Sequence, residues 1–350
     1  MRAQSRPAEA HPYGTATVQC LDITMRAAAH SPGDSRSVRP IFSVRGPEAT
    51  VDPLNTRSLR SHIMRIESQP VGRDYPLGHH PAVLASHGAR TASNSCGYLL
   101  PHLREGMSVL DVGCGPGTIT LDLAAVVAPG LVTGIENVED PLVTARREAQ
   151  ERGDTTTVFE QGDVFALGYD DDSFDVVHAH QVLQHVTDPV AALGEMSRVC
   201  KPGGIVAARD VDYEVMAWHP ASPALTLWLS IYRTTAKLND HQPDAGRHLR
   251  QWANAAGLED VAITASSWCY ADSESTRWWG ESQADRVLTP AFAARAGSQE
   301  LLDADLHDMA QGWRAWGTNP DAFFVMIHGE MLAKPARLTP ADTSRPRFPA

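Results

Sequence analysis

Three alternating glycines are the strongest sign of a ligand site in this sequence. Gly113, Gly115 and Gly117 follow an apolar run that begins at Val109. Glycine lets a chain turn sharply and lets the backbone approach a ligand, because no Cβ stands in the way. The turn is therefore predicted to contact a ligand, and an acidic residue, Asp111, stands two places before its first glycine.

A second carboxylate has the spacing of a nucleotide ligand. Glu136 ends the apolar run Leu131–Ile135, roughly twenty residues after the glycine turn, where a Rossmann-type site accepts hydrogen bonds from ribose hydroxyls. We therefore expect Glu136 to bind a ribose, with Asn137 as a weaker candidate. The alternative is a solvated loop carboxylate.

The elements that must position these residues alternate as in a doubly wound α/β sheet. Short apolar runs predict strands, and longer runs with helical periodicity predict the helices between them. The expected strands are the run from Val109, then 131–135, 156–159, 174–179 and 205–208, and the expected helices are 119–127 and 141–153.

The glycine spacing separates two families that share this pattern. The dinucleotide fingerprint G-x-G-x-x-G needs a glycine at position 118, where this chain has Thr118. The run from Asp111 to Gly117 instead resembles motif I of the class I S-adenosylmethionine (SAM)-dependent methyltransferases. That resemblance implies that the turn, with Cys114 in it, packs against the methionine portion of SAM.

Two longer segments extend the resemblance and narrow it. Ser173–Pro189 and Lys201–Tyr213 resemble motifs IV and V of the UbiE/COQ5-like branch (methyltransferase type 11/25), and the similarity runs from about Tyr75 to Leu332. The resemblance implies a Rossmann-like seven-stranded sheet with helical lid insertions. It also implies an enzyme that transfers the SAM methyl group by an SN2 reaction.

The resemblance assigns further cofactor residues. In this family the turn matching Gly162, Asp163 and Val164 holds adenine, with the carboxylate on the amino group and the apolar side chain on the ring. Asp163 can instead cap a turn, a common role for aspartate. His180 and Gln181, which leave the fourth strand, are expected to touch the amino acid end of SAM.

A general base is needed if the acceptor is a carbon acid, phenol or amine. His185, Asp210 and Tyr213 are the main candidates, and Asp212 and His219 are further ones. The histidines do not predict a metal site, because His178 and His180 share a strand face while His185 lies beyond a turn, and a metal needs three or four converging ligands.

The domain organisation is predicted from composition. Residues 1–70 lack periodicity and are expected to form a disordered extension, either a transit peptide or an over-extension upstream of Met64. The methyltransferase domain is expected at 71–335, with lid helices at about 76–104, 220–256 and 274–317, and a flexible tail at 336–350. Within the first lid, His87, Arg90 and Asn94 share one face of an expected helix.

The C-terminal part departs from the standard pattern. It predicts strands at 261–269 and 323–331 and helices at 223–238, 244–256, 275–294 and 298–316. The last two helices carry four tryptophans, Trp278, Trp279, Trp313 and Trp316. Such aromatic helices serve either as core or as the lid of an apolar substrate pocket.

Composition bears on the class of the methyl acceptor and on the cellular compartment. The chain has 350 residues, a formal net charge of −12 and only three lysines, which argues against a nucleic-acid substrate.

Its five cysteines form no C-x-x-C pair, so a reducing cytoplasm is expected. No apolar run is long enough to span a membrane. The expected partner is a small-molecule acceptor, and homo-oligomerisation stays open.

The predicted function is methyl transfer to a small molecule, either a secondary metabolite or a quinone-like compound. An NAD-dependent Rossmann oxidoreductase and a non-catalytic SAM-binding protein are the alternatives. A nucleic-acid methyltransferase commonly has an N-P-P-Y-type motif after the fourth strand, where this chain has His180-Gln-Val-Leu. The motif therefore favours a small-molecule acceptor over nucleic acid.

Overall fold

A computed structural model describes residues 89–297, 299 and 301–336. The predicted extension at 1–70, residue His87 and the tail from 337 lie outside these residues, as does most of the first predicted lid. In the described part of that lid, the expected long helix is replaced by a short helix α2 (Ala92–Ser95) and a 3₁₀ turn η2 (Leu100–His102). Thr91 and Asn94 form a capping box at the start of α2.

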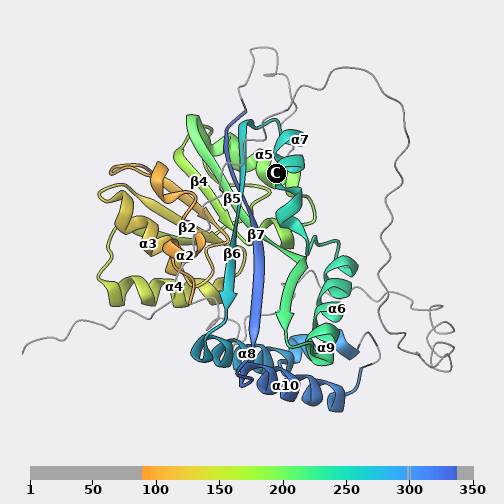
Figure 1. Ribbon diagram of the computed structural model, residues 1–350. Helices are drawn as coiled ribbons and strands as arrows, with labels where there is room; N and C mark the ends of the chain where they lie inside the picture. The colour runs from red at the N-terminus through yellow and green to blue at the C-terminus, as the bar shows by residue number, and fades with distance from the viewer. Residues whose placement is uncertain (1–88, 298, 300, 337–350) are drawn as a thin grey trace, which may run out of the picture. The chain divides into compact units, whose positions relative to one another are not determined.

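A seven-stranded sheet organises the fold, with strand order β3-β2-β1-β4-β5-β7-β6 (Figure 1). The strands β1 to β5 are parallel to one another, and β7 runs antiparallel to both β5 and β6. The strands are β1 (Val109–Val112), β2 (Val132–Glu136), β3 (Thr157–Gln161), β4 (Phe174–His180), β5 (Cys200–His219), β6 (Glu259–Tyr270) and β7 (Phe323–Lys334). The strand order reverses direction between β1 and β4, which is where open α/β sheets bind ligands.

Helices cover both faces of the sheet, because side chains alternate along its buried strands. Val109 and Val176 pack on one face with α3 (Thr118–Val127), and α4 (Glu139–Arg152) packs against α3. Leu110 and Val177 pack on the other face with α5 (Pro189–Val199) and α7 (Leu249–Ala255). The predicted doubly wound α/β fold is confirmed.

The fifth strand is much longer than the predicted 205–208. It continues to His219 because β7 pairs with it along its length, with a register shift between Asp212 and Ala217. The predicted helix 244–256 is a 3₁₀ turn η4 (Ala245–His248) followed by α7. These differences come from long-range pairing and packing, which local periodicity does not report.

Four helices lie beside the far ends of β5, β6 and β7 (Figure 1). They are α6 (Pro223–Leu238), α8 (Ser273–Val287), α9 (Pro290–Gly297) and α10 (Asp303–Gly317). The predicted helix 275–294 is thus two helices that meet at Leu288–Thr289, directly before Pro290. Proline is tolerated at a helix start but breaks a helix interior.

Glycines bring two of these helices into close contact. A Cβ added to Gly280 of α8 would lie 2.7 Å from the Trp313 carbonyl oxygen and 2.9 Å from Gly317 Cα of α10. Trp313 and Trp316 are buried in the core that α8 and α10 build with β7. Of the two roles predicted for the tryptophans, these two therefore serve as core.

Candidate functional site

The glycine turn leaves β1 in a conformation that favours glycine at every second position. Gly113, Gly115 and Gly117 have φ angles of 67°, 55° and 80°. A Cβ on Gly113 would lie 2.4 Å from Val182 Cγ2, and one on Gly117 would lie 2.8 Å from Ala145 Cβ. A Cβ on Gly115 would meet no atom within 4 Å. Two glycines thus allow close packing, whereas Gly115 presents bare backbone to open space.

Asp111 lies beneath the turn, where protein groups engage both of its oxygens. Thr120 Oγ1 donates to Oδ2 at 2.6 Å, and His178 Nδ1 lies 2.7 Å from Oδ1. Burial alone would lower the pKa of His178, but Cys96, whose sulfur lies 3.3 Å from Nε2, and Asp111 raise it to about 10. The protonated imidazole therefore donates to Asp111. We infer that Asp111 holds the turn from below.

Glu136 reaches the turn from the end of β2. Its Oε2 accepts a hydrogen bond from the Gly115 backbone N–H at 3.1 Å, and its Oε1 accepts one from the Asn137 N–H at 3.0 Å. The half-buried carboxylate therefore lies at the open side of the glycine turn. Cys114 is buried beside it, and burial raises the pKa of its thiol well above the usual value.

The loop after β3 carries the predicted adenine residues. The Gly162 N–H donates to the Glu136 carbonyl at 3.0 Å, which joins this loop to the ribose position. Asp163 is exposed, and its Oδ1 accepts from the Phe165 N–H at 2.9 Å, so it does cap a turn. Val164 is buried in the sheet core, and the exposed apolar side chain at this edge is Phe165. The sequence did not suggest Phe165 as a site residue.

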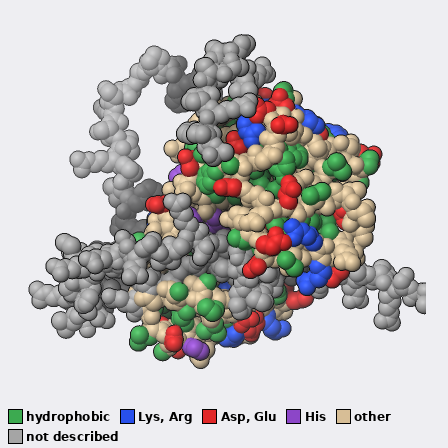
Figure 2. Space-filling model, turned by 180° about the vertical axis from the view of Figure 1, so that it is seen from behind, with side chains coloured by type: hydrophobic (Ala, Val, Ile, Leu, Met, Phe, Trp, Pro, Cys, Tyr) green, Lys and Arg blue, Asp and Glu red, His purple; other side chains and the backbone are tan. Residues whose placement is uncertain are grey.

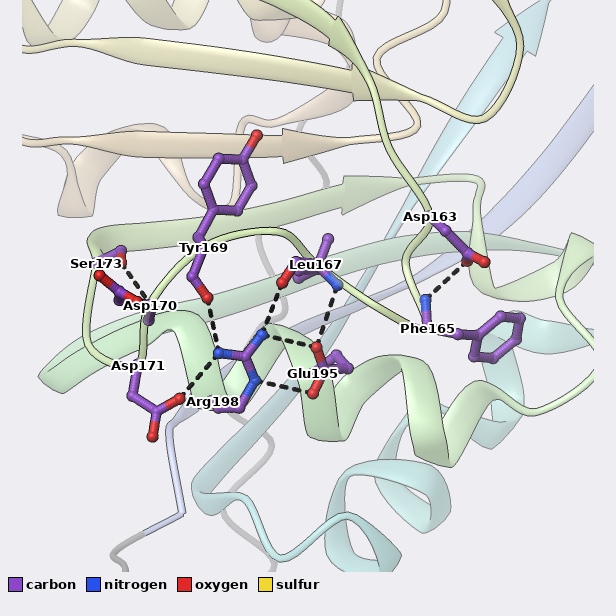
Figure 3. Close-up of polar contacts among 9 residues, drawn as sticks. All are labelled: Asp163, Phe165, Leu167, Tyr169, Asp170, Asp171, Ser173, Glu195 and Arg198. Atoms are coloured by element: carbon purple, nitrogen blue, oxygen red, sulfur yellow. Dashed lines mark hydrogen bonds and ion pairs between the residues drawn. The ribbon is translucent and has the colours of Figure 1, made fainter. Parts of the chain in front are cut away.

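Arg198 of α5 holds the segment that follows Asp163 (Figure 3). Its two terminal nitrogens donate to the carbonyls of Tyr169 and Leu167 at 2.8 and 2.9 Å. The same guanidinium pairs with Asp171 and with Glu195. The sequence did not flag Arg198, because its partners in the loop lie 27 to 31 residues away.

The corner after β4 joins the cofactor turn to the rest of the sheet. Gln181 has a φ of 55°, its amide oxygen accepts from Arg90 at 2.9 Å, and its amide nitrogen lies 2.9 Å from His328 Nε2. His180 is buried, and neither ring nitrogen has a hydrogen-bond partner among the described residues. Burial and nearby Arg209 lower its pKa well below the usual value. A neutral, unpartnered imidazole therefore stands beside the turn.

An aromatic pocket opens between the sheet, α6 and α8. Six aromatic side chains line it: Tyr213, Trp228, Tyr232, Trp268, Tyr270 and Trp279. Its polar lining consists of Gln181, Gln184, Gln283, Arg90 and Arg286. The pocket is thus lined by both aromatic and polar groups, and its free volume is about 30 Å³, so an acceptor that enters it must displace side chains of the lining. Trp279 lines the pocket and also belongs to the buried core that contains Trp313 and Trp316, so its predicted lid role stays a prediction.

Of the three main base candidates, Tyr213 alone lines this pocket, where its ring stacks on Tyr232 at 4.1 Å between centroids. His185 and Asp210 lie one layer behind it, each in contact with Gln184. His185 Nε2 lies 2.8 Å from the Gln184 amide nitrogen, and Asp210 Oδ1 accepts from the Gln184 N–H at 3.1 Å. Burial raises the pKa of Asp210 to about 7.

The two further candidates lie away from the pocket lining. Asp212 forms an ion pair with Arg247, and His219 is an exposed residue at the end of β5. Both are therefore poorly placed to take a proton from a molecule in the pocket.

In the described part of the chain, no group of three His, Cys, Asp or Glu side chains could hold a metal ion. None of the helices there combines the length and apolar character needed to cross a bilayer. On the face in Figure 2, acidic and basic side chains are interspersed.

Comparison with known proteins gives the family. Residues 103–267 match the family described as a methyltransferase domain. An uncharacterised methyltransferase of Schizosaccharomyces pombe is 33% identical, over 74% of this chain and 96% of the yeast protein. A probable methyltransferase of Aspergillus luteorubrus is 28% identical over the same shares, 74% and 96%.

A shorter match concerns the branch. The ubiquinone/menaquinone biosynthesis C-methyltransferase UbiE of Bdellovibrio bacteriovorus is 43% identical, over 29% of this chain and 43% of that protein. The chain therefore belongs to the class I methyltransferases of the UbiE-like branch, enzymes that use S-adenosylmethionine as methyl donor.

Proposed function

We propose that the protein transfers the methyl group of SAM to a small molecule bound in the aromatic pocket. One observation carries this proposal: the glycine turn and the pocket adjoin at the corner after β4. Val182 packs against Gly113, and its neighbour Gln181 lines the pocket. A cofactor on the turn and an acceptor in the pocket would therefore meet at this corner.

The residues present fit SAM. Gly115 exposes bare backbone to open space, and the unpartnered ring nitrogens of His180 await a polar group. In this proposal the turn from Gly113 to Gly117 holds the methionine portion, and His180 with Gln181 binds its amino acid end. The remaining cofactor contacts in this proposal come from two loops: Glu136 and Asn137 bind the ribose, and Gly162 and Asp163 bind the adenine, with Phe165 in place of the buried Val164 as the apolar contact.

Bound SAM supplies an electrophilic methyl group for direct displacement by the acceptor. The chain contributes alignment and exclusion of water, which are sufficient for large rate effects when the reacting atoms are held in line. The stacked pair Tyr213 and Tyr232 and the stacked pair Tyr270 and Trp279 line the pocket, and in this proposal their rings contact a planar acceptor and exclude water from it.

Tyr213 is the best placed group to move a proton, since it alone of the main candidates lines the pocket. His185 and Asp210 act through Gln184, which both contact and which also lines the pocket. We assign them a positioning role.

A quinone-like compound or another conjugated metabolite is the acceptor class that best suits these walls. The UbiE relative is named for ubiquinone and menaquinone biosynthesis, and the two longer matches are fungal methyltransferases. The net charge of −12 argues against a nucleic-acid acceptor, which needs clustered positive charge.

Two experiments test the function. Calorimetric titration should show that SAM and S-adenosylhomocysteine bind and that NAD does not; the opposite result would overturn the cofactor assignment. Incubation with labelled SAM and a producer-cell extract, followed by mass spectrometry, should yield a labelled small molecule. A label confined to nucleic acid or protein, or no transfer at all despite SAM binding, would contradict the acceptor class or favour a non-catalytic SAM-binding protein.

A further inference from the structure

One face of α8 points polar groups into the aromatic pocket. Trp279, Gln283 and Arg286 are spaced by four and three residues, so they share a helix face. All three line the pocket, and they are 4%, 1% and 9% exposed. The opposite side of α8 carries Glu281 and Asp285, which pair with Arg314 of α10.

These three side chains hold donors that the protein does not use. Trp279 Nε1, Gln283 Nε2 and Arg286 Nε are buried and have no hydrogen-bond partner among the described residues. A buried donor without an acceptor costs about 1–3 kcal/mol, and a charged one costs more. Three such donors on one helix face are thus explained by an acceptor group that a ligand brings.

The charge of the pocket points to the nature of that ligand. Among the described residues, Arg286 forms no ion pair, and no Asp or Glu lines the pocket. Because arginine stays protonated in proteins, the buried Arg286 guanidinium is a positive charge that no described carboxylate neutralises.

We propose that the methyl acceptor is a planar aromatic or conjugated carboxylate, and that its carboxylate binds to Trp279, Gln283 and Arg286. A guanidinium presents a planar fork of N–H donors that matches a carboxylate, and bonds between charged partners are the stronger ones. The inference rests on the proposed function, whose acceptor class it specifies. It follows from the chemistry of α8 and requires no particular metabolite.

Such anchoring also orients the acceptor. The carboxylate would then lie at α8, and the methylated atom would lie toward Gln181, whose neighbour Val182 packs against Gly113 of the glycine turn.

The test compares two probes of nearly equal shape, 2-naphthoate and methyl 2-naphthoate, by calorimetry on the full chain saturated with S-adenosylhomocysteine. The wild type should bind naphthoate at least tenfold more tightly than its uncharged ester. Arg286→Gln should weaken naphthoate binding at least tenfold and leave ester binding nearly unchanged. Arg277→Gln is the matched control, because Arg277 is an exposed arginine on the same helix, and it should change neither affinity.

Equal affinity of the wild type for the two probes, or no saturable binding of naphthoate, would overturn the inference. So would an Arg286→Gln variant that still prefers naphthoate. Thermal melting of each variant reports folding, and Gln283→Met provides a second, uncharged change in the same cluster that should also weaken naphthoate. Titration of S-adenosylhomocysteine alone separates the two proposals. If S-adenosylhomocysteine does not bind, the proposed function is wrong, whereas the preference of the pocket for naphthoate over its ester can still be measured.

Discussion

The cofactor half of the molecule (residues 109–180 together with α5) and the acceptor half (the other residues from 181 to 334) differ in how many buried polar groups lack a partner. In the cofactor half, the two ring nitrogens of His180, which we propose to bind SAM, are the only buried side-chain nitrogens or oxygens without a hydrogen-bond partner among the described residues. In the described residues of the acceptor half, more groups lack a partner, including Gln184 Oε1, Gln283 Nε2 and Arg286 Nε. The cofactor half therefore leaves one residue unpartnered before its ligand binds, whereas the acceptor half leaves several.

The largest expected effect concerns the buried pair of His178 and Asp111 in the cofactor half. Since the pKa of folded His178 is raised to about 10, its stabilisation is fully present below about pH 6.5, the ordinary pKa, and is lost as pH rises through about 10. The free energy of unfolding should fall by an amount on the order of a few kcal/mol across this window.

His178→Asn isolates this contribution, because an amide can still donate to Asp111 but carries no charge. Chemical denaturation at several pH values should show the variant least stable relative to wild type near pH 6, with the gap narrowing toward pH 10. A gap that does not change with pH would mean that the His178–Asp111 pair is not charged.

Glu136 tests which half binds SAM. Glu136→Ala should lower SAM affinity by about a hundredfold, since it removes two charge-assisted ribose hydrogen bonds and the acceptor for the Gly115 N–H. Calorimetry measures the change, and binding of 2-naphthoate to the acceptor half should persist. Glu151→Ala, on the exposed side of α4, is the control. Normal SAM binding by the Glu136→Ala variant would show that Glu136 does not bind the ribose of SAM.

Substitutions of Tyr213 and His185 test which of the two residues moves the proton in the acceptor half. Tyr213→Phe keeps the stack on Tyr232 but removes the hydroxyl, so turnover should fall by about tenfold or more while SAM affinity stays unchanged. His185→Ala should lower turnover less, because His185 reaches the pocket through Gln184. If His185→Ala proves the more damaging variant in kcat, the assignment of the base reverses. Loss of SAM binding in either variant would place that residue in the cofactor site.

The two halves were also unequally predictable from sequence. The glycine turn, Glu136 and the strands around them follow from local spacing, because they belong to one βαβ unit; the contact of Asp111 with His178 of β4 lies outside that unit and was not predicted. The acceptor half depends on antiparallel pairing of β5 with β7, which extends β5 to His219. Its key groups, Trp268 and Arg286, carry no local signature. Pro290 lies inside the predicted helix 275–294, and it could have divided that helix, because it begins α9.

The arginine that steadies the adenine loop gives the smallest expected effect. Arg198 donates to the carbonyls of Leu167 and Tyr169 and pairs with Glu195 (Figure 3). Arg198→Ala leaves those carbonyls to water and loosens the loop that carries Asp163. Because Arg198 does not itself reach the ligand, SAM affinity should fall only about fivefold, in line with about 1 kcal/mol for ordering a partly exposed network.

Arg314→Ala is the matched control for this last change. Arg314 resembles Arg198 in exposure, 39% against 30% for the side chains, and it too pairs with two carboxylates, but those lie on α8 in the acceptor half. It should leave SAM affinity unchanged. An equal loss of SAM affinity in both variants would show that the halves are coupled through global stability, and the contrast between the two halves would then not describe binding.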